Sequence, residues 1–243
     1  HQSDHIFKAC GLPVFFPSSV QDIRDMGLHA FALSRFAGVW SAMKTIQEIV
    51  ESSASISVDP DRVDIILPED FRMPAGGLHI RWPDMPLEQE ARLMDYKWYA
   101  ALAYVRANRL NYNVIEGPND RFGIIASGKA YNDTRQALQD LGLDEATCRR
   151  IGLRLHKVNV VWPLEATITR EFAEGLEEIL VVEEKRQVIE YQLKEELYGW
   201  RPDVRPRVLG KFDESEAEDG GGEWSQANPS QHWLLRAQAD LTP

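Results

Sequence analysis

From Arg121 onward the sequence alternates short apolar runs with amphipathic stretches, and this alternation constrains the fold more than any other feature. The apolar runs FGIIAS, LRLHKVNVVWPL and EILVVEEK predict strands. They are followed in turn by GKAYNDTRQALQDLG, EATITREFAEGLE and RQVIEYQLKEELYGW, which predict helices. Strands that are apolar along their whole length are typical of a parallel sheet with helices on both faces. The sequence therefore predicts an α/β fold with an open, mostly parallel sheet and right-handed crossovers.

Upstream of residue 110 the pattern is less regular. LPVFFPSS is a short apolar run closed by a proline and two serines, which predicts a strand. Ser18 or Ser19 would then cap a helix over VQDIRDMGLHAFALSRF, where apolar residues recur every three or four positions. Gly38 would end this helix. VWSAMKTIQEIV fits either a buried strand or a helix.

The next part of the chain contains a segment rich in helix-breaking residues and then a long helical pattern. Residues 59–84 contain four prolines and two adjacent glycines, so we expect an extended connecting segment. PLEQEARLMDYKWYAALAYVRANRLN predicts a long helix starting at Pro86. We expect its aromatic residues to form a packing surface rather than a cofactor-binding stack: Tyr96, Trp98, Tyr99 and Tyr104. The acidic, glycine-rich stretch 211–228 is expected to be a linker or mobile loop.

Charge and cysteine content limit the classes of function. The chain has 27 lysines and arginines against 38 acidic residues, and the resulting net charge of −11 disfavours nucleic-acid binding. No apolar run reaches the roughly 18 residues of a membrane span, so no membrane partner is expected. Cys10 and Cys148 are too few for an iron–sulfur cluster and indicate reduced thiols of a cytoplasmic protein. The start at His1, without Met or a processing signal, is interpreted as the edge of an excised fragment.

The first five residues, HQSDH, have the spacing of a possible metal site. On a helix, His1 and His5 would share one face, as two zinc ligands do in metalloproteases. Such a helix carries Glu directly after the first His as general base, whereas this chain has Gln2. No third ligand can be located, and a helix so close to residue 1 would fray. We therefore predict no metal site and interpret the segment as a loop of a larger body.

Two further motifs lie where strands are predicted to end. In ASGKAY, backbone amides around Ser127 and Gly128 could hold an anion near Lys129, although Ala130 stands where a phosphate loop needs Ser or Thr. The favoured interpretation is a tight turn from strand to helix. In VVEEK, Glu183 and Glu184 could do acid–base chemistry, but we favour a role in capping the next helix.

Other chemistry is not indicated by the residues alone. His156 lies within a predicted strand, and we interpret it as a buried histidine with satisfied hydrogen bonds rather than as a catalyst. No nucleophile–base pair can be identified.

Several stretches together resemble one family of large enzymes. They run in order across residues 1 to about 212 and include HQSDHIF, GLPVFFPSSVQDIRDMGLHAFALSRFAGVW, ESSASISVDPDR, GGLHIRWPDMPLEQEARL, GIIASGKAYNDTRQALQDLG and VVWPLEATITREFAEGLEEILVVEEKRQVIEYQLKEELY. The chain resembles the 2-oxoacid:ferredoxin oxidoreductases, specifically the fused bacterial indolepyruvate ferredoxin oxidoreductase type. The collinearity of the stretches is more specific than any one of them.

The resemblance implies a division of the chain into four segments. Residues 1–59 would be the C-terminal half of a domain that binds the pyrimidine of thiamine diphosphate. Residues 60–118 would connect it, through the long helix, to a transketolase C-terminal-like α/β domain at 119–207. Residues 208–243 would be an acidic, glycine-rich linker and tail.

The resemblance also implies an activity and its partners. The full enzyme would oxidatively decarboxylate an indolepyruvate-like 2-oxoacid to an acyl-CoA, using thiamine diphosphate with Mg²⁺ and [4Fe–4S] clusters, with ferredoxin as electron acceptor. The partners would be coenzyme A, ferredoxin, the remaining domains of the same polypeptide and a second copy in a homodimer. The HQSDH loop would lie near the cofactor, which makes four residues the candidates for cofactor binding: His1, Ser3, Asp4 and His5.

The fragment alone would be inactive and would bind no cofactor, because the family's main catalytic motifs match nothing in it. The alternative is a non-catalytic α/β scaffold, or a module that binds a small anion at ASGKAY.

Overall fold

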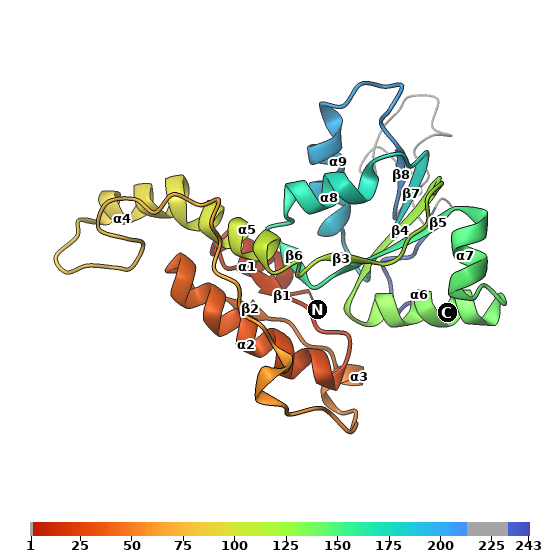
Figure 1. Cartoon of the computed structure of the whole chain (residues 1–243), viewed down its shortest axis with the longest axis horizontal. Helices are drawn as coiled ribbons and strands as arrows, with labels where there is room; N and C mark the ends of the chain where they lie inside the picture. The colour runs from red at the N-terminus through yellow and green to blue at the C-terminus, as the bar shows by residue number, and fades with distance from the viewer. Residues whose placement is uncertain (1, 213–232) are drawn as a thin grey trace. The chain divides into compact units, whose positions relative to one another are not determined.

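The computed structural model describes residues 2–212 and 233–243, and these form two compact units (Figure 1). The first unit contains residues 3–111 and 159–168, and the second contains Gln2, residues 112–158 and residues from 169 onward. Most of the stretch 211–228, predicted to be a linker, lies outside the described residues. The predicted division at residues 59, 118 and 207 does not coincide with these units. It stays a prediction about the domains of the full protein.

The first unit combines a small sheet with helices. Its strands are β1 (Val14–Phe15), β2 (Ala42–Met43) and β6 (Val160–Trp162), in the order β2-β1-β6, with β1 parallel to β2 and antiparallel to β6. Its helical elements are α1 (Asp4–Ala9), α2 (Val20–Ala37), α3 (Gln47–Val50), the 3₁₀ turn η1 (Pro60–Arg62), α4 (Pro86–Arg92), the π-helical η2 (Leu93–Lys97) and α5 (Trp98–Ala107).

Local signals correctly predicted the strand β1 and the helix α2 of this unit. The predicted strand at LPVFFPSS contains β1, and the Ser19 side chain caps α2 by accepting a hydrogen bond of 3.0 Å from the Asp22 amide. Gly38 ends α2 with a left-handed φ of 67°. The ambiguous stretch VWSAMKTIQEIV holds both kinds of element, β2 followed by the short α3.

The long helix predicted from Pro86 forms, with a π-helical segment in its middle, but its aromatic residues do not all pack. Tyr104 is fully buried, and Trp98 makes an edge-to-face contact with Trp162 at 5.9 Å. Tyr96 and Tyr99 are 41% and 59% exposed, so the predicted packing surface is wrong for these two residues.

Gly38 occupies a position that alanine should not tolerate. Its backbone is left-handed, and a Cβ atom there would lie 2.5 Å from the carbonyl oxygen of Leu78. We expect Gly38→Ala to lower the free energy of unfolding by about 2 kcal/mol, because the left-handed conformation alone costs a non-glycine residue about 1–2 kcal/mol.

The matched control is Gly27→Ala in the same helix. A Cβ at Gly27 would meet nothing within 4 Å, so this change should stabilise the protein by about 0.5–1 kcal/mol through helix propensity. Urea unfolding of both variants provides the measurement. Equal stability of the two variants would show that Gly38 is not conformationally required.

The second unit is built on a five-stranded sheet in the order β3-β5-β4-β7-β8. Its strands are β3 (Tyr112–Ile115), β4 (Phe122–Ser127), β5 (Leu153–Val158), β7 (Glu178–Val182) and β8 (Arg207–Leu209). All neighbouring pairs are parallel except β3 and β5. Its helices are α6 (Gly128–Asp140), α7 (Glu145–Ile151) and α9 (Ile189–Tyr198), while α8 (Ala166–Ala173) begins in the first unit's range and ends in this one.

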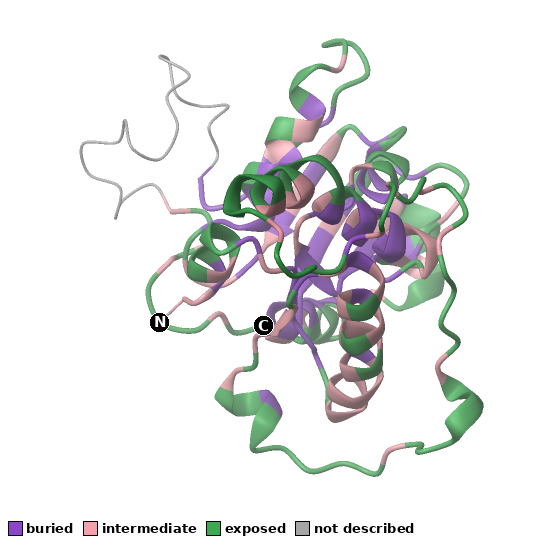
Figure 2. Ribbon diagram, turned by 90° about the vertical axis from the view of Figure 1, so that its left-hand side faces the viewer, coloured by how far each residue is buried: buried purple, intermediate pink, exposed green. Residues whose placement is uncertain are grey.

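Helices cover both faces of this sheet, as predicted. Successive residues of a strand point to opposite faces. Leu155 of β5 packs in a buried cluster with Leu138 of α6 and Cys148 of α7, whereas the next residue, His156, contacts Phe172 of α8. Buried residues accordingly gather on the strands (Figure 2). The α/β fold class with an open, mostly parallel sheet is confirmed.

One predicted strand is in fact two. LRLHKVNVVWPL was expected to be continuous, but Asn159 separates β5, in the five-stranded sheet, from β6, in the three-stranded sheet. The stretch is apolar on both sides of Asn159, so its local pattern gives no sign of the break. In the described part of the second unit, three elements were not predicted at all: the edge strand β3, the short helix α7 and the edge strand β8.

Candidate functional site

The N-terminal segment, which sequence analysis singled out, forms the start of a helix. The Ser3 carbonyl accepts hydrogen bonds from the amides of Ile6 and Phe7, and α1 begins at Asp4. The expectation that a helix would not form here was wrong, because Ser3 and the following residues close a regular first turn. His1 lies outside the described residues, and His5 is exposed.

Asp4 is the buried member of this segment and has a cationic partner. The Lys44 ammonium donates to its Oδ2 at 2.7 Å and also lies 4.4 Å from the centre of the Phe16 ring. Asp4 is only 2% exposed, so the pair is held away from water. A buried carboxylate is stable when it is paired and hydrogen-bonded in this way.

The position of this pair in the sheet is where ligands are often bound. Phe16 follows β1 and Lys44 follows β2, and these parallel strands end at the same edge of the three-stranded sheet. Open α/β sheets bind ligands outside the carboxyl ends of their strands. Lys44 was not predicted as a site residue, and no local signal marks it, because its pairing with Asp4 arises from the tertiary fold.

The described residues offer no metal-binding cluster. Within 2–212 and 233–243, no group of three or more His, Cys, Asp or Glu side chains is arranged to hold a metal ion. The two cysteines are free thiols, Cys10 exposed and Cys148 buried. In the same ranges, no helix is long and apolar enough to cross a membrane.

The ASGKAY motif forms a tight junction at the end of β4. The chain passes from Ser127 directly into α6 through Gly128, which has a φ of 53°. The Lys129 ammonium contacts Asp133 at 2.7 Å, the Leu241 carbonyl at 2.6 Å and Glu184 at 3.6 Å. Because Lys129 is the lysine that an anion at this motif would need, these contacts support the interpretation of ASGKAY as a structural turn.

Glu183, in the VVEEK motif, caps α9. Its carboxylate accepts hydrogen bonds from the amides of Val188, Ile189 and Glu190 at 2.9–3.1 Å. Burial raises the pKa of Glu183 to about 7, an effect that these three hydrogen bonds partly oppose. The helix-capping role predicted for the motif therefore belongs to Glu183.

His156 is a structural residue of the second unit. Its Nδ1 atom lies 2.7 Å from Oδ1 of Asn113, and its ring contacts Phe172 with centroids 4.7 Å apart. Asn113 belongs to β3, the strand that pairs with β5, so this contact ties the edge strand to the sheet. His156 is 1% exposed and is hydrogen-bonded through its Nδ1 atom, so the prediction of a buried, structural histidine is confirmed, whereas full hydrogen-bond satisfaction of its ring is not.

Comparison with known proteins identifies relatives of this chain. Residues 111–243 match the family described as indolepyruvate ferredoxin oxidoreductase middle domain. The indolepyruvate oxidoreductase subunit IorA of Pyrococcus abyssi is 30% identical over 216 residues, which cover 85% of this chain and 31% of the relative. IorA of Methanothermobacter thermautotrophicus is 27% identical over 215 residues, covering 86% and 32%. The chain thus spans about a third of the length of these curated relatives.

Among solved structures, the 2-oxoglutarate:ferredoxin oxidoreductase from Magnetococcus marinus is 12% identical, with a TM-score of 0.47. The alignment covers 82% of this chain and 38% of that one. The family match at residues 111–243 takes in more than half of the 243 residues. The chain therefore belongs to the indolepyruvate ferredoxin oxidoreductase family.

Proposed function

We propose that this chain is part of a cytoplasmic oxidoreductase that converts an indolepyruvate-like 2-oxoacid and coenzyme A to an acyl-CoA and passes the electrons to ferredoxin. The observation that carries the proposal is the match of residues 111–243 to the family's middle domain. Thiamine diphosphate supplies the electron sink for decarboxylation in such enzymes, and iron–sulfur clusters carry single electrons. The chain alone is inactive, and the full protein works as a homodimer.

The described residues provide ligands neither for Mg²⁺ nor for a [4Fe–4S] cluster. They form no metal-ligand cluster for the Mg²⁺ that accompanies the diphosphate, and two cysteines cannot hold a [4Fe–4S] cluster. We therefore assign these groups to other parts of the full protein. In this proposal, the chain contributes by positioning side chains beside the cofactor.

We place this contribution at the edge of the three-stranded sheet where the parallel strands β1 and β2 end. The ion pair between Asp4 and Lys44 fixes the start of α1 against the ends of β1 and β2. Ser3 and His5 lie next to Asp4 in sequence, His1 lies three residues before it, and His5 is exposed. We propose that this segment lies beside the bound thiamine diphosphate, with Asp4 orienting it and His5 available for contact.

The test uses the full-length protein and compares two exposed histidines. Wild-type protein should reduce a viologen dye in the presence of indolepyruvate, coenzyme A and thiamine diphosphate. His5→Gln should raise the thiamine diphosphate concentration needed for half-maximal activity several-fold, because one contact with the cofactor is lost. The matched control, His79→Gln, removes an exposed histidine of the connecting segment and should leave this concentration unchanged.

The outcomes separate the two parts of the proposal. Full-length protein that reduces no dye with any 2-oxoacid would contradict the activity. Dye reduction with identical thiamine dependence in His5→Gln and wild type would leave the activity standing and contradict the placement of the N-terminal segment.

The contacts of Lys129 do not favour the alternative, a module that binds a small anion at this lysine of ASGKAY. Lys129 is engaged by Asp133 and by the Leu241 carbonyl, both within the same unit.

A further inference from the structure

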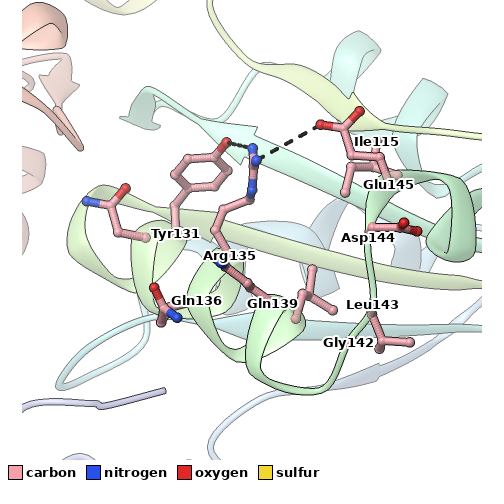
Figure 3. A pocket seen from close by; sticks show the side chains of 11 residues that line it. Ile115, Tyr131, Arg135, Gln136, Gln139, Gly142, Leu143, Asp144 and Glu145 are labelled. Carbon is pink, nitrogen blue, oxygen red and sulfur yellow. Dashed lines mark hydrogen bonds and ion pairs between the residues drawn. The ribbon is translucent and has the colours of Figure 1, made fainter.

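A cavity in the second unit, lined by Tyr131 at the end of the ASGKAY motif but not by Lys129, has the composition of a small-molecule site. It lies between α6 and α7 and has a volume of about 580 Å³ (Figure 3). Pockets that bind small molecules typically have volumes of about 300–1,000 Å³ and combine apolar walls with a few polar groups. Here the apolar wall comes from Ile115, Leu138 and Leu143.

Arg135 supplies the cationic group of this cavity. Its Nη1 donates to the Tyr131 hydroxyl at 3.1 Å, and its Nη2 lies 4.0 Å from Oε1 of Glu145. These are the polar contacts of this guanidinium among the described residues. A guanidinium carries five N–H donors in a planar fork that matches a carboxylate. Arg135 is 44% exposed in its side chain and so retains donors that a ligand can reach.

Tyr131 lies beside Arg135 and is a second hydrogen-bonding group. The residue is 9% exposed, and the Lys157 ammonium lies 5.1 Å from the centre of its ring. The Tyr131 oxygen accepts the hydrogen bond from Arg135, so this bond does not use the Tyr131 O–H, which can donate to an oxyanion. Figure 3 shows the guanidinium between this hydroxyl and Glu145.

Glu145 places a negative charge beside Arg135. Its carboxylate is 49% exposed and is also 3.4 Å from Arg149. The neighbouring Asp144 is engaged in the turn, where it accepts from the Thr147 amide at 2.7 Å. An exposed ion pair at 4.0 Å contributes little stability, so a ligand can separate its two members at small cost.

We propose that this cavity binds an apolar α-amino acid in its zwitterionic form. The ligand carboxylate contacts the Arg135 guanidinium and the Tyr131 hydroxyl, and the ligand ammonium contacts Glu145. The side chain of the ligand packs against the apolar wall of Ile115, Leu138 and Leu143. An α-amino acid carries its two charges on one carbon, which suits a cationic and an anionic group only 4.0 Å apart.

Isothermal titration of the 243-residue chain with three related probes tests this proposal. L-Phenylalanine should bind, whereas 3-phenylpropionate, which lacks the ammonium, and 2-phenylethylamine, which lacks the carboxylate, should bind roughly tenfold or more weakly. A hydrogen bond to a charged group contributes enough free energy for such a factor.

Two substitutions assign the binding to named residues. Arg135→Gln should weaken phenylalanine binding roughly tenfold or more. The matched control, Arg201→Gln, removes a 75% exposed arginine outside the cavity and should change nothing. Glu145→Gln should weaken phenylalanine binding without weakening that of 3-phenylpropionate. The two substituted residues of the cavity are about half exposed, so both variants should fold, which circular dichroism verifies.

Several results would overturn the proposal. These are the absence of phenylalanine binding to the wild-type chain, unchanged binding to Arg135→Gln, or 3-phenylpropionate binding as tightly as phenylalanine. The last result would assign the cavity to simple carboxylates instead.

Discussion

Replacing Asn111 by alanine should lower the free energy of unfolding by about 3 kcal/mol or more. Asn111 is 1% exposed. Its Oδ1 accepts from the amides of Asn159 and Val160, each at 2.9 Å, and its Nδ2 donates to the Val160 carbonyl at 3.2 Å. Alanine leaves three buried backbone groups without this partner, and each such group costs about 1–3 kcal/mol.

The structural consequence concerns β6. This strand is only three residues long and pairs with β1 on one side, so the Asn111 side chain acts as its second partner. The control is Asn119→Ala, where an exposed asparagine is lost and stability should change by less than about 0.5 kcal/mol. Urea unfolding curves measure both. A loss below about 1 kcal/mol for Asn111→Ala would show that β1 alone holds β6.

The strand β6 also shows which features of the fold could not be predicted from local sequence signals. Local signals were sufficient where the determining groups are close in sequence: Ser19 caps α2 through Asp22, and Gly128 turns β4 into α6. The break between β5 and β6 depends instead on β1, about 145 residues earlier, and on Asn111. An apolar run does not reveal which sheet each half of it will join.

The candidate sites divide in the same way. Tyr131 and Arg135 are four residues apart on α6, so their contact could be predicted from helical spacing. Glu145 reaches Arg135 only because the chain turns at Gly142, and Lys44 reaches Asp4 only because β1 and β2 pair in register. Glu183 was correctly given a capping role from its place after a strand. The shift of its pKa could not be predicted from the sequence, because it depends on how deeply the carboxyl group is buried in the fold.

That shift makes the stability of the second unit depend on pH. The pKa of Glu183 is raised to about 7 from its ordinary 4.5, so the folded state favours the neutral carboxyl group. The contribution of this group is fully present below about pH 4.5 and is lost as the pH rises through 7. With about 1.36 kcal/mol for each pH unit, the loss over this interval amounts to about 3 kcal/mol.

Glu183→Gln should remove this dependence, because an amide stays neutral at every pH. The variant should be about as stable as wild type near pH 4.5, apart from about 1 kcal/mol for the amide nitrogen, which cannot accept a backbone hydrogen bond. At pH 7.5 it should therefore be the more stable protein by about 2 kcal/mol.

The control, Glu195→Gln, removes an exposed carboxylate from α9, the helix that Glu183 caps, and should follow the wild-type pH curve. Urea unfolding at half-unit steps from pH 4.5 to 7.5 gives the two curves. Parallel curves for wild type and Glu183→Gln would mean that Glu183 is ionised in the fold, with its charge held by the three amides at the start of α9.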